Sequence, residues 1–381
     1  MSRTPGRYAA AILSFLISAL CETPGRAAPP PPPVSPLIQH AQKLIKSNDS
    51  IGFRCLVKKA YQRKITRQEW YSLRALVVAQ ADRSGFDLVR LWNARLNQGK
   101  SELDRALDNA DQLMLKGKFE EAFAGYQKCA VELKKDKTAG PIFPYVLHSM
   151  GRALYGAKRF SEALTVYSWI PRTYPRFRQI MFEKMWTAFR LGRVETALGA
   201  IASQRSAYFS PFLSPEAYLI QTYIYRRLCR QKDLNQVLGE LRNYEQLLSA
   251  GALKSWAGSD TEATLLLRLR DEPISPENTD IISLAEKKAE QKSIGDALQR
   301  TFQKQRPKFL ADIKTVLAYA HLAGATDTAL TLKPIKKLTS REALLKMNLE
   351  IWPADSAEEW VDEIGSHEFI GESLCQKAFD R

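Results

Sequence analysis

The sequence predicts an all-α protein, built largely from helical hairpins that repeat along the middle of the chain. Three observations predict it. A ten-residue pattern with a central small residue recurs four times between residues 117 and 241. Each copy is preceded, twelve residues upstream, by a matching position in another amphipathic segment. The segments on both sides of the repeats carry apolar residues at helical spacing.

Composition and charge narrow the class of protein. The chain has 381 residues, of which 45% are hydrophobic and 25% charged, so disorder through most of its length is excluded. No apolar run reaches the roughly 18 residues that a membrane-spanning helix needs, which excludes a polytopic membrane protein. The net charge is +15. Such a charge favours an acidic protein, an anionic lipid or polymer, or a nucleic acid as partner.

Residues 1–28 have the layout of a secretory signal peptide. Arg3 and Arg7 give a positive start, residues 9–20 are apolar, and Ala27 and Ala28 supply small residues for cleavage. A buried amphipathic helix is the alternative, but residues 9–20 lack a polar face. We therefore expect an exported protein, periplasmic or associated with an outer membrane, with no transmembrane span after cleavage. Export argues against DNA or RNA as the partner.

A lipid anchor at Cys21 is not expected, because a lipoprotein signal places a small residue before the modified cysteine and this chain has Leu20. Residues 29–36 form a proline-rich linker that begins with five consecutive prolines. Such a run cannot continue a helix and forms an extended spacer.

Residues 37–100 read as several amphipathic helices. Residues 66–81 are the best defined, because Thr66 and Glu69 have the spacing of a capping box at a helix start. We expect these helices to be degenerate repeats or an N-terminal cap over the apolar edge of the first repeat.

Residues 101–250 contain the repeats. The four anchors, spaced by 41, 34 and 40 residues, are Ala122, Ala163, Ala197 and Val237. The positions twelve residues upstream are Ala110, Gly151, Met185 and Tyr225. Small residues let two antiparallel helices approach closely, and we expect contacts such as Ala110 with Ala122. A non-repetitive bundle with chance alanines is the alternative.

The pattern resembles the tetratricopeptide repeat. The unit around residues 147–175 matches best, with Gly151, Phe160, Ala163, Tyr167 and Pro175 at mutually consistent offsets. The resemblance covers somewhat over a third of the chain. It implies a right-handed α-solenoid of stacked hairpins, each of which buries its apolar face against its neighbours.

The C-terminal third begins with an expected break. Residues 251–278 contain glycines and prolines and are predicted to be a linker. Residues 279–381 then form a helical region: a long charged helix to residue 305, a bend at Pro307 and a return helix from residue 309. We expect a helical hairpin or a capping bundle. The acidic cluster at residues 358–363 is interpreted as a docking site within the chain rather than a metal site.

No pattern of known chemistry is present, so we predict no enzyme, no cofactor and no metal. The four histidines lack metal-ligand spacing, and the nucleophile, zinc and phosphate-loop motifs are absent. The cysteines that follow the signal peptide allow three pairings; they are Cys55, Cys129, Cys229 and Cys375. We favour small apolar helix contacts over disulfides for them.

The resemblance also implies a binding surface, because the first helix of each hairpin lines the concave face of such arrays. The residues that this places on the face, forming a basic stripe interleaved with aromatics, are Arg152, Tyr155, Trp186, Arg190, Arg226 and Arg230. Arginine pairs with carboxylates and aromatic residues anchor interfaces, so a groove for an acidic or C-terminal peptide is predicted. The alternative places the aromatic residues in the core and the arginines in solvent.

These observations favour a non-catalytic scaffold or adaptor in a bacterial cell-envelope complex, serving assembly, motility or secretion machinery. The second hypothesis is a protein whose basic surface binds anionic lipid or wall polymer directly. The two differ in salt dependence, because polymer binding weakens steeply with ionic strength.

Overall fold

The computed structural model describes residues 35–94, 102–135, 142–206, 209, 212–321, 364–369 and 373–375. Within these ranges every regular element is a helix, which confirms the all-α class. The expected signal peptide, Cys21, most of the proline linker and the acidic cluster lie outside the described residues. Among the described helices, none has both the length and the hydrophobicity for a membrane span.

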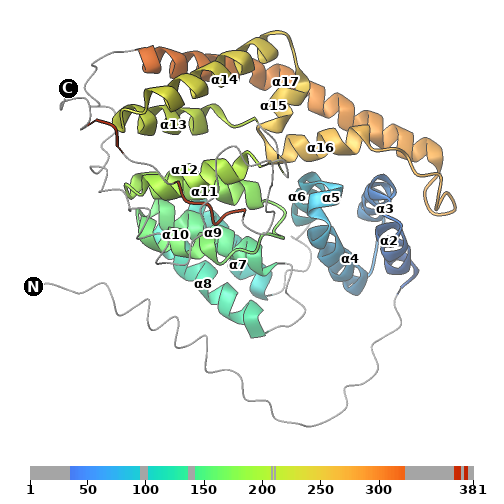
Figure 1. The fold of residues 1–381 in the computed structure, drawn as a ribbon. Helices are drawn as coiled ribbons and strands as arrows, with labels where there is room; N and C mark the ends of the chain where they lie inside the picture. The colour runs from blue at the N-terminus through green and yellow to red at the C-terminus, as the bar shows by residue number, and fades with distance from the viewer. Residues whose placement is uncertain are drawn as a thin grey trace, which may run out of the picture. The chain divides into compact units, whose positions relative to one another are not determined.

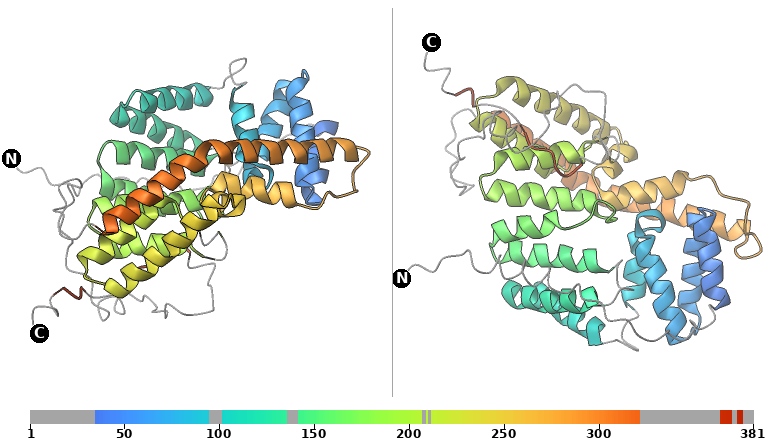
Figure 2. Two further views of the ribbon diagram at one scale, coloured as in Figure 1. Left: turned by 90° about the horizontal axis from the view of Figure 1, so that it is seen from above. Right: turned by 60° about the horizontal axis from the view of Figure 1, so that its bottom comes forward.

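The middle of the chain is a series of helices in which each one packs against the next (Figure 1). Figure 2 shows these helices side by side in chain order. Their bounds are α7 (Glu102–Leu115), α8 (Phe119–Lys135), α9 (Phe143–Gly156), α10 (Phe160–Ser168), α11 (Phe177–Arg190), α12 (Val194–Gln204), α13 (Pro215–Arg227) and α14 (Gln231–Ser249). Packing between neighbours along the chain is how an array of hairpins buries its apolar surface.

The same turn joins the two helices of each hairpin. One residue has positive φ at each of the four turns, namely Gly117, Lys158, Gly192 and Cys229. The amide of the residue after it donates to a carbonyl five residues back, as from Lys118 N to Leu113 O. This left-handed C-cap closes the first helix and reverses the chain. The recurrence of one turn supports the repeat predicted from the sequence.

The turn also corrects the register of the fourth repeat. In the first three hairpins the small anchor lies five residues after the positive-φ residue. In the fourth, the same count from Cys229 gives Leu234, so the expected anchor Val237 is three residues out of register. The upstream position is then Thr222, which is fully buried, rather than Tyr225. Three residues are almost one helical turn, so Leu234 and Val237 are both buried and the pattern conceals the shift.

Small residues permit close contacts inside the hairpins. Ala122, Ala163 and Ala197 are fully buried, as predicted for anchors. A Cβ added to Gly151 would lie 2.4 Å from the ring of Tyr167, so the ring fills the space that the missing side chain leaves. The Cβ of Ala110 lies 3.0 Å from the position that a Cβ on Gly125 would occupy. Ala110 therefore faces α8 about one turn after Ala122.

The N-terminal helices share an apolar core with the C-terminal ones. Their bounds are α2 (Pro36–Lys46), α3 (Ser50–Gln62), α4 (Arg67–Ala79), α5 (Ala81–Ser84) and α6 (Phe86–Ala94). The predicted capping box is confirmed, since Thr66 and Glu69 exchange both bonds at the start of α4. The α2–α3 turn repeats the hairpin turn, with positive φ at Asn48 and a bond from Asp49 N to Leu44 O. Sequence reasoning did not predict that these helices pack against the C-terminal third of the chain.

Residues 251–278 are not a linker as expected, because two helices lie in this range: α15 (Leu253–Gly258) and α16 (Thr261–Asp271). Gly251 forms a left-handed turn after α14 instead of a break in the fold. Trp256 on α15 is 1% exposed and packs against Phe302, with ring centroids 5.5 Å apart. The side chain of Trp256 therefore joins this segment to the hydrophobic core.

The expected return helix from residue 309 is also corrected. α17 (Leu284–His321) continues through Pro307 as one helix of 38 residues, whose direction changes along its length (Figure 2). It packs against α3, α13, α14, α15 and α16. A proline removes one backbone bond and crowds the preceding turn, but packing on both sides outweighs that cost here. Residues 309–321 therefore belong to α17 and do not start a return helix, and residues 322–363 lie outside the described residues.

Candidate partner-binding surfaces

The six predicted binding residues fall into three separate settings. Arg152 and Tyr155 lie on α9, and Trp186 and Arg190 lie on α11. In the corrected register Arg226 corresponds to Tyr155, while Arg230 precedes α14 and belongs to a turn. The structure brings Trp186 and Arg190 into contact but does not join all six into one stripe.

Arg152 belongs to a network around the carboxylate of Glu183 on α11. Arg152 Nε lies 3.1 Å from Glu183 Oε1, and Gln179 Nε2 donates to the same oxygen at 3.1 Å. Oε2 accepts from the Tyr167 hydroxyl at 2.9 Å and lies 3.0 Å from His148 Nε2. Four side chains from α9, α10 and α11 thus converge on one largely buried carboxylate.

The network stabilises the charged form of Glu183. Burial alone would raise the pKa of this carboxyl, but His148, Arg152 and Tyr167 together hold the pKa below its usual value. On its other side, His148 Nδ1 lies 2.9 Å from the hydroxyl of the buried Tyr174. Half of the Arg152 side chain, 51%, remains exposed, so its outer face is accessible from solvent.

Trp186 and Arg190 form an aromatic and basic pair on α11. The Trp186 indole donates from Nε1 to Glu216 Oε2 on α13 at 3.1 Å and is partly buried against the core. The guanidinium carbon of Arg190 lies 5.9 Å from the centre of the Trp186 ring, within reach of a cation–π contact. Tyr155, in turn, packs edge-on against Phe160 at 5.1 Å. The three aromatic and basic side chains are thus partly packed and partly accessible.

Arg226 and Arg230 are engaged elsewhere within the chain. Arg226 donates from Nη1 to Tyr319 O of α17 at 3.2 Å and lies 5.4 Å from the Tyr319 ring centre. Arg230 donates from Nε to Asp233 at 2.5 Å and lies 5.1 Å from the Phe369 ring centre. These two arginines therefore face α17 and the C-terminal segment, which sequence reasoning did not predict.

The C-terminal segment of residues 364–369, drawn in dark red, crosses α11 and α12 (Figure 1). Lys184 Nζ donates to Gly365 O at 2.6 Å, and Gly365 N donates to Ser203 Oγ at 2.9 Å. Farther along, Phe369 N donates to Glu195 O at 3.1 Å. No helical periodicity marks this segment in the sequence, so only tertiary structure reveals it.

One disulfide joins Cys229, in the α13–α14 turn, to Cys375 near the C-terminus. The expectation that the cysteines are only small apolar contacts is therefore wrong for this pair, whose Cα atoms lie 5.0 Å apart. Cys55 and Cys129 are buried thiols, as favoured from the sequence. Burial raises the pKa of the Cys55 thiol to about 12, which keeps it protonated and unreactive at neutral pH.

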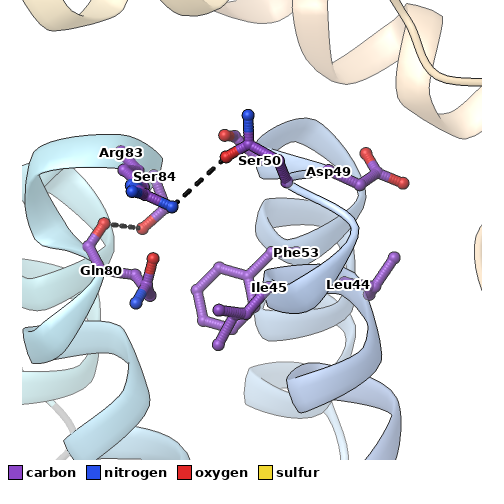
Figure 3. Close-up of a pocket in the computed structure, with 9 residues that line it drawn as sticks. Leu44, Ile45, Asp49, Ser50, Phe53, Gln80, Arg83 and Ser84 are labelled. Atoms are coloured by element: carbon purple, nitrogen blue, oxygen red, sulfur yellow. Dashed lines mark hydrogen bonds between the residues drawn. The ribbon is translucent and has the colours of Figure 1, made fainter.

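In the part of the chain that the structure describes, no group of three or more His, Cys, Asp or Glu side chains is arranged to hold a metal ion. A small hollow lies between the α2–α3 turn and α5, where Ile45 and Phe53 point into the space between the helices (Figure 3). Arg83 closes one side by donating to Asn48 Oδ1 at 3.3 Å. The hollow has room for about one water molecule, which is too little for a substrate.

Comparison with protein-family models, with curated proteins and with solved structures found no match to this chain.

Proposed function

We propose that this protein is a non-catalytic scaffold or adaptor that binds a protein partner in a bacterial cell-envelope complex. The observation that carries the proposal is the recurrence of one hairpin turn at Gly117, Lys158, Gly192 and Cys229 between helices packed in chain order. We infer a right-handed solenoid similar to tetratricopeptide arrays. Such arrays present long surfaces rather than enclosed pockets, which suits the binding of other proteins.

Placement in the envelope is supported by two features. Residues 1–28 have the signal-peptide layout, and the Cys229–Cys375 bond is of a kind that persists in oxidising compartments such as the periplasm. The net charge of +15 supports an acidic partner. We therefore propose an exported protein, either periplasmic or associated with an outer membrane.

The proposed contact surface is the face of α9 and α11 around Arg152, Tyr155, Trp186 and Arg190. Arg190 is held over Trp186, so its guanidinium is oriented before a ligand carboxylate arrives. Arg152 presents an exposed face while Glu183 fixes its Nε. An acidic or C-terminal peptide segment suits this pair, because arginine binds carboxylates in a defined geometry.

The proposal is tested by affinity capture from crosslinked cells of the source organism, followed by mass spectrometry. Wild type, Arg190→Ala and the control Lys128→Ala are compared; Lys128 is an exposed basic residue on α8. One or two envelope proteins should be captured stoichiometrically by wild type and by Lys128→Ala, and several-fold less by Arg190→Ala. Equal capture by all three proteins contradicts this surface, and recovery of lipid or wall polymer alone contradicts the adaptor.

A second candidate function, binding to an anionic lipid or wall polymer, is favoured by α17. Its exposed basic residues, mostly spaced by four, are Lys288, Lys292, Arg300, Lys304, Lys308 and Lys314. Residues four apart lie on neighbouring turns of a helix, so most of these charges form a basic ridge that winds around α17, with the exposed Asp296 in the gap between Lys292 and Arg300. Binding through it should weaken steeply with salt and should fall in a Lys292→Gln/Arg300→Gln/Lys304→Gln variant. Arg190→Ala should leave such binding unchanged.

A further inference from the structure

We propose that α11, α12 and the α13–α14 turn form a binding site for a short peptide segment, which residues 364–369 of the same chain occupy in this structure. A partner segment of the same chemistry would occupy it in trans: a glycine followed by a carboxylate three residues on and an aromatic residue four residues on. This inference rests on the proposed adaptor function and names the kind of segment that the adaptor takes. The site is separate from the face around Trp186 and Arg190.

The segment is held through its backbone. Gly365 engages the site with both peptide groups, its oxygen accepting from Lys184 and its amide donating to Ser203. The Phe369 amide donates to the carbonyl of Glu195 at the start of α12. Backbone bonds of this kind hold a peptide segment whatever its side chains are, and main-chain hydrogen bonds recur in peptide recognition.

The site also fits the segment closely in shape. A Cβ added to Gly199 on α12 would lie 1.8 Å from His367 O, so the backbone of the segment takes the place of a side chain there. Gly365 has φ +96°, and a Cβ on it would lie 2.9 Å from the Phe177 ring. A glycine on each side of the contact is therefore required, which indicates a fitted site rather than loose packing.

The side chains of the segment also contact the site. Ile364 is buried in the same core cluster as Phe177 and Met181. The Glu368 carboxylate accepts from Thr196 Oγ1 at 2.9 Å, and Phe369 lies 6.2 Å from the Tyr225 ring. His367 Nδ1 lies 2.9 Å from Ser203 Oγ. Together with Gly365, these contacts define the ligand as an apolar residue, glycine, one variable position, a side chain that bonds Ser203, a carboxylate and an aromatic.

The segment is tethered close to its site. A bond from Leu374 N to Leu228 O at 2.8 Å and the Cys229–Cys375 disulfide hold the chain five and six residues beyond Phe369. A tethered segment competes at a high effective concentration, so a partner segment gains access only when the tether is absent or its own affinity is higher. The disulfide thus sets the occupancy of the site.

A competition experiment on the full chain tests this inference. The variant Gly365→Val/Cys375→Ser should release the segment while leaving the site intact. The probe is a fluorescein-labelled synthetic peptide with the sequence of residues 362–371, and binding is followed by fluorescence anisotropy. We expect the variant to bind the probe at least about tenfold more tightly than the wild type. A peptide with valine at the position of Gly365 should bind at least about tenfold more weakly.

Adding Gly199→Ala to the variant should abolish probe binding, whereas adding Gly239→Ala should not, because a Cβ at Gly239 meets no atom within 4 Å. Failure of the released variant to bind the probe overturns the inference. A doubled molecular mass without probe binding also overturns it, since a second copy would then be the occupant.

A second measurement covers the case in which the double variant does not fold. In the otherwise natural chain, Gly199→Ala should raise amide exchange at Gly365 and Phe369 at least about tenfold, and Gly239→Ala should not. Unchanged exchange overturns the inference. An adaptor that still loses its captured partner on Arg190→Ala but ignores Gly199→Ala would retain the proposed function without this site.

Discussion

Arg54 on α3 donates from Nε to Glu290 Oε1 on α17 at 2.8 Å, although 236 residues separate them along the chain. Arg54 is 1% exposed, and its guanidinium also pairs with Asp87 at 2.7 Å. Nearby, Lys287 Nζ donates to Asp49 Oδ2 at 2.6 Å, and neither side chain is exposed by more than 2%. Two buried ionic contacts therefore join the N-terminal helices to α17.

Removing this link should destabilise the protein strongly. Glu290→Ala leaves the buried Arg54 Nε without its carboxylate partner, which should cost about 2–4 kcal/mol of unfolding free energy. Urea unfolding followed by circular dichroism measures it. The matched control is Asp280→Ala, whose pair with Lys43 is exposed and should be worth less than about 1 kcal/mol. Equal losses of unfolding free energy in the two variants would contradict a stabilising role for the buried Arg54–Glu290 contact.

The Glu183 network should make stability depend on pH in a defined direction. Because the pKa of folded Glu183 is lowered, its contribution is present above the unfolded pKa of about 4.3 and is lost as pH falls through the folded pKa. Glu183→Gln should cost about 2 kcal/mol near pH 6. Urea unfolding from pH 6 to 3 should show this difference shrinking, and a constant difference would count against the network.

The hairpin turns predict two changes of opposite sign. Lys158 has φ 61°, where a non-glycine residue is strained, so Lys158→Gly should stabilise the protein by up to about 1 kcal/mol. Gly117 has φ 71° and open space around its Cβ position, so Gly117→Ala should cost about 1 kcal/mol through backbone strain alone. Thermal unfolding measures both. Changes of the same sign would mean that the two turns are not equivalent.

The corrected fourth repeat predicts a contrast between two buried threonines. Among the described residues, Thr222 Oγ1 has no hydrogen-bond partner, whereas Thr187 Oγ1 donates to Glu183 O at 2.7 Å. Thr222→Val should therefore be neutral or stabilising by up to about 1 kcal/mol, and Thr187→Val should cost about that much. Chemical denaturation distinguishes them. A large loss at Thr222 would show that its hydroxyl is bonded.

Local patterns account for what the sequence predicted well. The capping box at Thr66 and Glu69 and the alanine anchors depend on neighbours along one helix or one hairpin, so their spacing is visible in the sequence. The shift from Val237 to Leu234 was hidden because both positions face the core. Helical periodicity locates a buried face but does not fix which turn of the helix carries the anchor.

Features that depend on tertiary contacts were missed or misjudged. Glycine and proline near residues 251–278 resemble a linker, yet Trp256 and its buried contact with Phe302 hold helices there. Pro307 suggests that a second, returning helix begins there, but packing carries α17 through the proline as one helix. The docking of residues 364–369 depends on Gly199, whose missing side chain has no meaning until the distant segment is placed beside it.

Site-specific photocrosslinking tests the adaptor most directly. A photoreactive phenylalanine is placed at Arg190 and, as a control, at Lys128 on α8, in intact cells of the source organism. The account predicts that light links the Arg190 position to one or two defined envelope proteins, identified by mass spectrometry, while the Lys128 position gives none of them. Crosslinks from both positions to the same broad set of molecules, or from Arg190 to lipid and polymer alone, would contradict it.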